Sequence, residues 1–117
     1  MTAFRLISLP AHGAMELVIG VALMAAPFAL GFSAAAVDFV VALGAVVAGL
    51  ALNAAVADTG TIDIAAHYSY DLALAVGSLG AGVVFALAGQ TAAAGTLLGA
   101  GLGLVALNLT TRYSARR

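Results

Sequence analysis

Two short spacings in the chain carry the residue types best suited to chemistry. His12 and Glu16 stand four positions apart, and so do His67 and Asp71. On a helix this spacing places both side chains of a pair on one face. Imidazole and carboxylate groups bind divalent metals such as zinc, iron or manganese, and they also take up and release protons. Each pair therefore predicts either part of an ion or proton site or a local pair that stabilises a helix end.

The rare polar residues also recur along the chain at a fixed offset. Three pairs are separated by 55 positions: His12 and His67, Glu16 and Asp71, and Asn53 and Asn108. The chain has no other histidine or asparagine, so these matches are unusual in a composition rich in Ala, Leu and Gly. We interpret the offset as a duplicated two-helix hairpin, over about 12–54 and 67–109. Two spans per unit would make the repeats parallel, related by an axis along the membrane normal.

The composition indicates which class of protein carries these residues. Of the 117 residues, 64% are apolar and only 8% are charged, whereas soluble domains are about 25% charged. This excludes a soluble enzyme, and we expect no enzymatic activity. The four basic residues give no patch for nucleic acid: Arg5, Arg112, Arg116 and Arg117. The absence of cysteine excludes disulfides and thiolate metal sites.

Long uncharged stretches predict an all-α integral membrane protein. A helix of about 20 apolar residues crosses a bilayer, and the chain divides into four such helices at about 10–31, 34–57, 65–88 and 91–112. They would form one transmembrane domain over 1–117, a four-helix bundle built from the two repeats. A cleaved signal peptide is a poor match to the first span. The arginines near both ends predict a multi-pass protein of the cell (inner) membrane with both termini in the cytoplasm, although the acidic loop 58–63 lies on the same side.

Six polar side chains would lie at similar depth in one leaflet: His12, Glu16, Asn53, His67, Asp71 and Asn108. If the bundle closes with two-fold symmetry they could converge into an ion or proton site. Otherwise they serve as helix-end pairs and caps. We expect the second arrangement, with each His–acid pair self-contained and the two imidazole rings well separated. For Asp38 we expect a dipole and interface role near the outer surface.

Glycines predict the helix-packing faces. Gly95, Gly99 and Gly103 repeat every four residues, and Gly77 lies in a similar stripe with Ala73 and Ala81. Such stripes allow close approach of helices, within the bundle or in an oligomer. Pro27 should bend the first helix because it removes a backbone hydrogen bond.

One segment carries a family resemblance. The sequence Ala26-Pro27-Phe28-Ala29-Leu30-Gly31-Phe32-Ser33 and the lead-in at 12–16 resemble the SPW-repeat family of small bacterial membrane proteins. That family has Ser-Pro-Trp in the first of two transmembrane helices. Here Ala26 and Phe28 replace the Ser and the Trp, and the second half has no proline at the matching place. The resemblance implies the fold and no particular activity.

The sequence leaves several functions open. We expect a structural or accessory membrane protein that contacts lipid and self-associates or docks on other membrane subunits. The alternatives are a small proton- or ion-coupled transporter and a metal- or pigment-binding protein, each using His12/Glu16 and His67/Asp71. Glu16 in the first helix is similar to the plan of the small multidrug resistance family, whose other motifs are absent. No cofactor or substrate is identified by the sequence.

Overall fold

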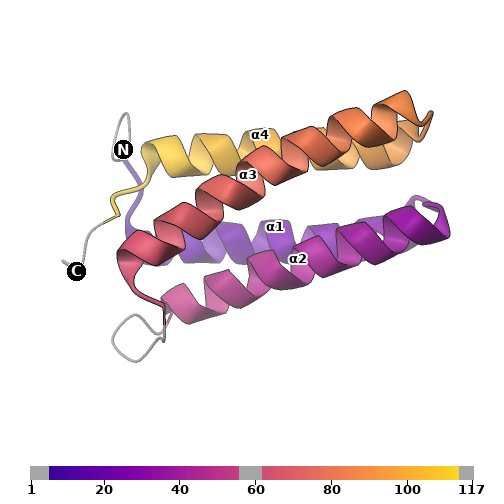
Figure 1. Cartoon of the computed structure of the whole chain (residues 1–117). Helices are drawn as coiled ribbons and strands as arrows, with labels where there is room; N and C mark the ends of the chain where they lie inside the picture. The colour runs from indigo at the N-terminus through magenta and orange to yellow at the C-terminus, as the bar shows by residue number, and fades with distance from the viewer. Residues whose placement is uncertain (1–5, 56–61, 114–117) are drawn as a thin grey trace.

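Four long helices follow one another up and down the molecule (Figure 1). The computed structural model describes residues 6–55 and 62–113. The helices are α1 (Leu9–Ala29), α2 (Ala34–Ala55), α3 (Ile64–Leu87) and α4 (Thr91–Thr110). All four are long and apolar enough to cross a membrane, which confirms the all-α multi-pass prediction. The predicted ends agree within two residues, apart from positions 56 and 57, which lie outside the described residues.

The helix ends follow from polar caps and from glycine. The Ser8 hydroxyl accepts a hydrogen bond from Ala11 N at 3.3 Å, and Asp63 Oδ1 accepts one from Ala66 N at 2.7 Å. Ser33 caps α2 in the same way, because its hydroxyl accepts a hydrogen bond from Ala36 N at 3.3 Å. The two short turns at the other end of the bundle contain Gly31 and Gly89 at φ 66° and 80°. This left-handed backbone favours glycine, so the α1–α2 and α3–α4 connections can be tight.

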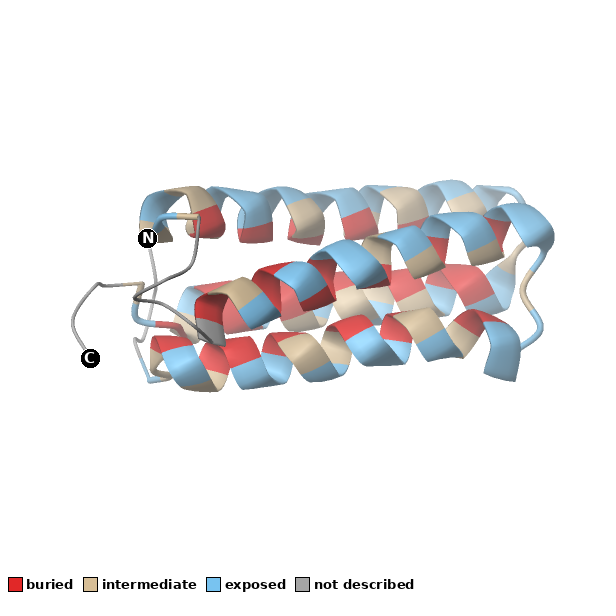
Figure 2. Ribbon diagram, turned by 90° about the horizontal axis from the view of Figure 1, so that it is seen from below, coloured by how far each residue is buried: buried red, intermediate tan, exposed pale blue. Residues whose placement is uncertain are grey.

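The helices pack as two hairpins, α1 with α2 and α3 with α4, and contacts between the hairpins are sparser. Buried positions line the inner faces of the helices (Figure 2), with a core of Leu23, Val40, Val47 and Leu97. Within the described chain, α1 and α3 lie diagonally, and no Cα of one comes within 8 Å of a Cα of the other. The two hairpins are the units that the 55-residue offset predicts, and the duplication itself stays a prediction.

Two glycines allow α1 and α2 to approach closely. A β-carbon added at Gly20 would lie 2.7 Å from Ala48 N and 2.9 Å from Gly44 O. A β-carbon at Gly44 would lie 2.7 Å from Gly20 O. Real β-carbons do not come this close to backbone atoms, so these two glycines allow the backbones of the first hairpin to touch.

The glycines chosen from the sequence do not have this role within the bundle. Gly77, Gly95 and Gly99 are exposed, and an added β-carbon would meet no described atom within 4 Å. At Gly103 it would meet only Ile19 Cδ1, at 3.8 Å. Of the two alternatives left open by the sequence, packing within the bundle is not seen at these glycines, because a four-residue period marks one face of a helix without saying which way that face points. Packing against another chain stays a prediction.

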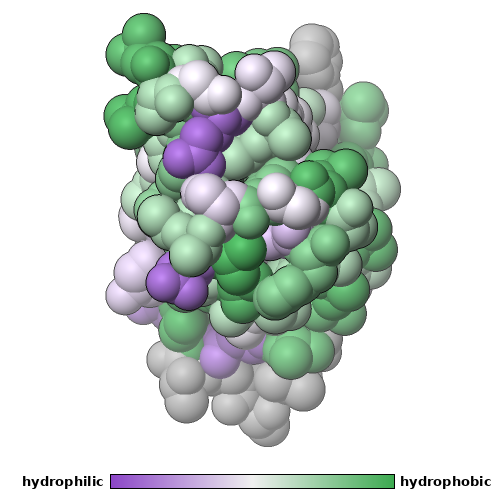
Figure 3. Space-filling view, turned by 90° about the vertical axis from the view of Figure 1, so that its right-hand side faces the viewer, coloured by the Kyte–Doolittle hydropathy of each residue, from purple (hydrophilic) through white to green (hydrophobic). Residues whose placement is uncertain are grey.

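The two ends of the bundle differ in character. At the end with the short turns the surface is mostly apolar with small hydrophilic patches (Figure 3), and the Ser33 hydroxyl donates to Gln90 Oε1 at 2.7 Å. Asp38 is exposed on α2. At the opposite end, α1 begins, α4 ends, and α2 connects to α3 (Figure 1). The cytoplasmic orientation of this end stays a prediction. Four charged residues on which the prediction draws lie outside the described residues: Arg5, Asp58, Arg116 and Arg117.

Candidate metal centre

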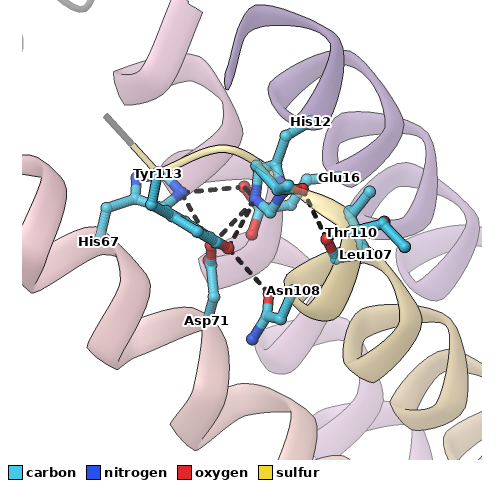
Figure 4. Close-up of polar contacts among 9 residues, drawn as sticks. His12, Glu16, His67, Asp71, Leu107, Asn108, Thr110 and Tyr113 are labelled. Carbon is cyan, nitrogen blue, oxygen red and sulfur yellow. Dashed lines mark hydrogen bonds and ion pairs between the residues drawn. The ribbon is translucent and has the colours of Figure 1, made fainter. Parts of the chain in front are cut away.

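Four ionisable side chains meet inside the bundle at the end where α1 begins (Figure 4). His12 and Glu16 come from the first two turns of α1, and His67 and Asp71 from the first two turns of α3. We call these four residues the His–acid centre. His12, Glu16 and Asp71 are 0% exposed and His67 is 3% exposed. At about 1.5 Å per residue, the carboxylates lie about 10 Å along their helices from the first residue.

Each imidazole faces both carboxylates. His12 Nε2 lies 2.9 Å from Asp71 Oδ2 and 3.7 Å from Glu16 Oε1. His67 Nε2 lies 3.3 Å from Glu16 Oε1 and 3.3 Å from Asp71 Oδ2. The nearest carboxylate of His12 therefore belongs to the other hairpin, and the side chains bridge two helices whose backbones do not touch.

The prediction of two self-contained pairs is wrong. The imidazole rings of His12 and His67 are only 5.8 Å apart between centroids. Spacing along one helix places two residues on a common face, but it does not say what that face meets across the bundle. Here both faces point inward, and a buried carboxylate is costly without close partners. Each imidazole therefore serves as a close partner for both carboxylates.

The two asparagines have separate roles. Asn108 lies beside the His–acid centre, where its Oδ1 is 2.9 Å from the hydroxyl of Tyr113. Asn53 binds the backbone just before α3, because its Oδ1 accepts a hydrogen bond from Ile62 N at 3.3 Å. The symmetric placement of the two asparagines expected from the offset is thus not reproduced in these contacts.

Two residues of the site were missed by the sequence analysis. Thr111 Oγ1 lies 2.8 Å from His12 Nδ1, and the Tyr113 hydroxyl donates to Asp71 Oδ2 at 2.6 Å. Both follow the last helix, and a parallel bridge between Ile7 and Thr111 brings their segment back to the site. No spacing rule could reveal them, since this contact joins the two ends of the chain.

Tyr113 covers the His–acid centre as a neutral group. Its ring packs against Tyr68 and His12, with centroids 4.8 Å and 5.2 Å away. Burial and the neighbouring Asp71 carboxylate raise the pKa of the Tyr113 phenol above its ordinary value. The phenol therefore keeps its proton at neutral pH and serves as a hydrogen-bond donor to Asp71.

Comparison of the chain with protein-family models, with curated proteins and with solved structures gives no match. The function must therefore be argued from the site, and the resemblance to the SPW-repeat family stays a prediction.

The donor set fits a metal ion. Each of the four residues offers one ligand atom, and these atoms all lie within 4.8 Å of one another. Two carboxylate oxygens, Glu16 Oε2 and Asp71 Oδ1, are buried without a hydrogen-bond partner among the described residues. Unpartnered buried carboxylate oxygens are unfavourable unless a cation is close. The arrangement thus provides two imidazole nitrogens and two carboxylate oxygens around one small volume.

Proposed function

We propose that this multi-pass membrane protein binds one divalent transition-metal ion in the His–acid centre. The observation that carries the proposal is the convergence of four buried ligand atoms, from His12, Glu16, His67 and Asp71, within 4.8 Å of one another. The ion would connect α1 to α3 and thereby one hairpin to the other. The centre would hold it as a closed, protein-only ligand set of the kind found in structural sites.

The distances support four-coordinate binding. Zinc bonds of about 2.1 Å imply ligand-to-ligand separations of about 3.4 Å in a tetrahedron. The imidazole-to-carboxylate distances are 2.9, 3.3, 3.3 and 3.7 Å. Small rotamer adjustments would therefore suffice to close the ligand set around an ion.

Charge and ligand type support the choice of ion. Two carboxylates in a low-dielectric interior need about two positive charges close by. The one arginine in the described part of the chain, Arg112, is exposed. A divalent ion would offset both negative charges. Two imidazole ligands favour zinc, cobalt, iron or a similar ion over calcium and magnesium, which prefer sets of oxygen ligands.

Metal titration of the detergent-purified protein tests the proposal. Co²⁺ serves as the spectroscopic probe and Zn²⁺ as its competitor, and we expect one ion per chain with the visible absorption of four-coordinate Co²⁺. The variants His12→Gln, Glu16→Gln, His67→Gln and Asp71→Asn should each weaken binding by more than about 100-fold, beyond the usual cost of losing an outer-shell partner. Asp38→Asn, at an exposed acid away from the centre, should bind as the unaltered protein does. No stoichiometric Co²⁺ binding, or equal loss in Asp38→Asn, would overturn the proposal.

Transport is less well supported than binding. The buried polar residues of the described chain are those around the His–acid centre and Ser78. Ser78 is seven residues beyond Asp71 on α3, and buried Ala75 and Gly82 lie near it on the same helix. A single hydroxyl does not provide a polar route for an ion through the rest of the bundle.

A second candidate function is that of a structural or accessory subunit. The exposed glycines Gly77 on α3 and Gly95 and Gly99 on α4 favour it, because nothing in the described chain lies within 4 Å of these β-carbon positions. Another helix could approach such a surface closely. If it does, Gly99→Leu should reduce cross-linking between subunits in membranes, whereas Gly49→Leu, at an equally open position on α2, should not.

A further inference from the structure

The segment that follows α4 is held against the start of the chain. Ile7 N donates to Thr110 O at 2.9 Å, and Arg112 N donates to Ile7 O at 2.8 Å. This short bridge places the Thr111 side chain inside the bundle, where it is 0% exposed. Its Oγ1 lies 2.8 Å from His12 Nδ1, whereas the carboxylates of Asp71 and Glu16 face Nε2 of the same ring.

The direction of the hydrogen bonds follows from the end of α4. Leu107 is among the last four residues of the helix, whose carbonyls lack a helical donor. The Thr111 hydroxyl donates to Leu107 O at 2.5 Å. A hydroxyl has a single proton. Thr111 Oγ1 can therefore only accept from His12 Nδ1, which lies 2.8 Å away.

This order places a proton on Nδ1 of the imidazole. With its proton on Nδ1, a neutral His12 ring has its lone pair on Nε2. That atom faces Asp71 Oδ2 at 2.9 Å, the Tyr113 hydroxyl at 3.4 Å and Glu16 Oε1 at 3.7 Å. A neutral Nε2 and the Asp71 carboxylate are both acceptors, and at 2.9 Å they repel unless a proton or a metal ion lies between them. The ring is thus oriented as a metal ligand whose other nitrogen has a defined outer partner.

We propose that Thr111 is a positioning residue of the metal centre. It holds His12 in the Nδ1–H tautomer and aims Nε2 at the ion, through the chain Leu107 carbonyl, Thr111 hydroxyl, His12 imidazole. This inference rests on the proposed function, since it concerns the same metal site. It adds that ion binding depends on the segment after α4, although that segment supplies no ligand to the ion.

A pair of adjacent threonines gives a matched test. Thr111→Val keeps the shape of the side chain and removes the hydroxyl. Thr110→Val removes a hydroxyl that donates to Ala106 O at 2.8 Å and also lies 3.3 Å from Leu107 O, but has no hydrogen bond to His12. We expect Thr111→Val to weaken Co²⁺ binding by about 10–100-fold, as for other outer-shell partners of metal ligands, and to shift the Co²⁺ absorption bands. Thr110→Val should change neither, and Thr111→Ser should restore both.

A second measurement avoids variants altogether. In ¹⁵N-histidine-labelled protein with Zn²⁺ bound, the His12 signals should show a protonated Nδ1 and a metal-bound Nε2. If Zn²⁺ occupies Nδ1, or if Thr111→Val has the affinity and spectrum of the unaltered protein, the inference about Thr111 is wrong while metal binding stands. If the unaltered protein binds neither Co²⁺ nor Zn²⁺, the proposed function itself fails.

Discussion

At the scale of single residues, Asp71 is the most connected member of the His–acid centre. One of its oxygens, Oδ2, lies close to both histidines and accepts from Tyr113. These partners come from three separate segments of the chain, so the position of the carboxylate is fixed from several directions. A residue held in this way is expected to matter for stability even without a metal ion.

Asp71→Asn should therefore destabilise the protein. The change keeps the size of the side chain but leaves two buried imidazoles facing one carboxylate. Breaking a buried ion pair costs about 3–5 kcal/mol. Asp38→Asn should stay within about 0.5 kcal/mol, as expected of an exposed site. The measurement is the free energy of unfolding in mixed micelles at increasing SDS, with a chelator present. Equal effects of the two variants would show that the centre contributes nothing to folding.

Tyr113→Phe isolates the hydroxyl that covers the centre. The phenyl ring would keep its contacts with Tyr68 and His12, while the hydrogen bond to Asp71 Oδ2 would be lost. Hydrogen bonds to charged groups contribute about 1.5–3 kcal/mol, and we expect a loss of unfolding free energy in that range. Tyr70→Phe, at an exposed tyrosine of α3, is the control. A loss of similar size in both variants would contradict a specific role for the Tyr113 hydroxyl.

The sequence was informative about the site up to the limits of local spacing. It singled out His12, Glu16, His67 and Asp71, because residues four apart share a helix face. It did not indicate that His12 would lie nearest to Asp71, since that contact depends on how the hairpins face each other. Thr111 carries no distinguishing pattern, and only the bridge to Ile7 brings it into the site.

At the scale of elements, hydrophobic length predicted the four helices to within two residues, whereas glycine spacing did not identify the faces that pack within the bundle. A span is recognised from composition, which bilayer thickness constrains strongly. Which face of a helix packs inward depends on the helix beside it. Gly20 and Gly44, which lie in no four-residue glycine repeat, are the ones where an added β-carbon would lie less than 3.0 Å from backbone atoms of the facing helix.

Gly20→Ala should destabilise the first hairpin. The added methyl group would lie 2.7 Å from Ala48 N, so α1 and α2 must separate. Overpacking costs about 1–3 kcal/mol, against which the better helix propensity of alanine returns at most about 1 kcal/mol. Gly49→Ala, where the methyl group meets no described atom within 4 Å, should leave the melting temperature unchanged or raise it. Thermal unfolding followed by circular dichroism decides the matter, and a Gly20→Ala protein as stable as the unaltered one would refute the close contact.

At the scale of the whole molecule, the His–acid centre joins two hairpins that otherwise pack sparsely against each other. Anything that binds the folded state alone raises its stability, by about 2.7 kcal/mol when the free ligand is at 100 times its dissociation constant. Zn²⁺ at that excess should raise the melting temperature of the detergent-purified protein, and EDTA should reverse the effect. Asp71→Asn should show no such shift. A rise of equal size in Asp71→Asn would mean that Zn²⁺ acts elsewhere on the protein.

Orientation in the membrane is the remaining property at this scale. The start of α1, the end of α4 and the α2–α3 connection share one end of the bundle (Figure 1). We expect that end to be cytoplasmic because the arginines come shortly before α1 and after α4 in the sequence. A reporter fused to the C-terminus should be active in the cytoplasm, and one inserted in the α3–α4 turn should be active on the other side. The opposite pattern would place the centre in the outer leaflet.

The division into hairpins has a consequence for assembly from fragments. The first hairpin carries one imidazole and one carboxylate on α1, and the second carries the same pair of groups on α3. In lipid, either hairpin expressed alone would leave an ionisable pair facing hydrocarbon, which is strongly unfavourable. Two separately expressed hairpins should therefore recombine into the complete bundle. A lone hairpin should pair with a copy of itself, because two copies supply two imidazoles and two carboxylates.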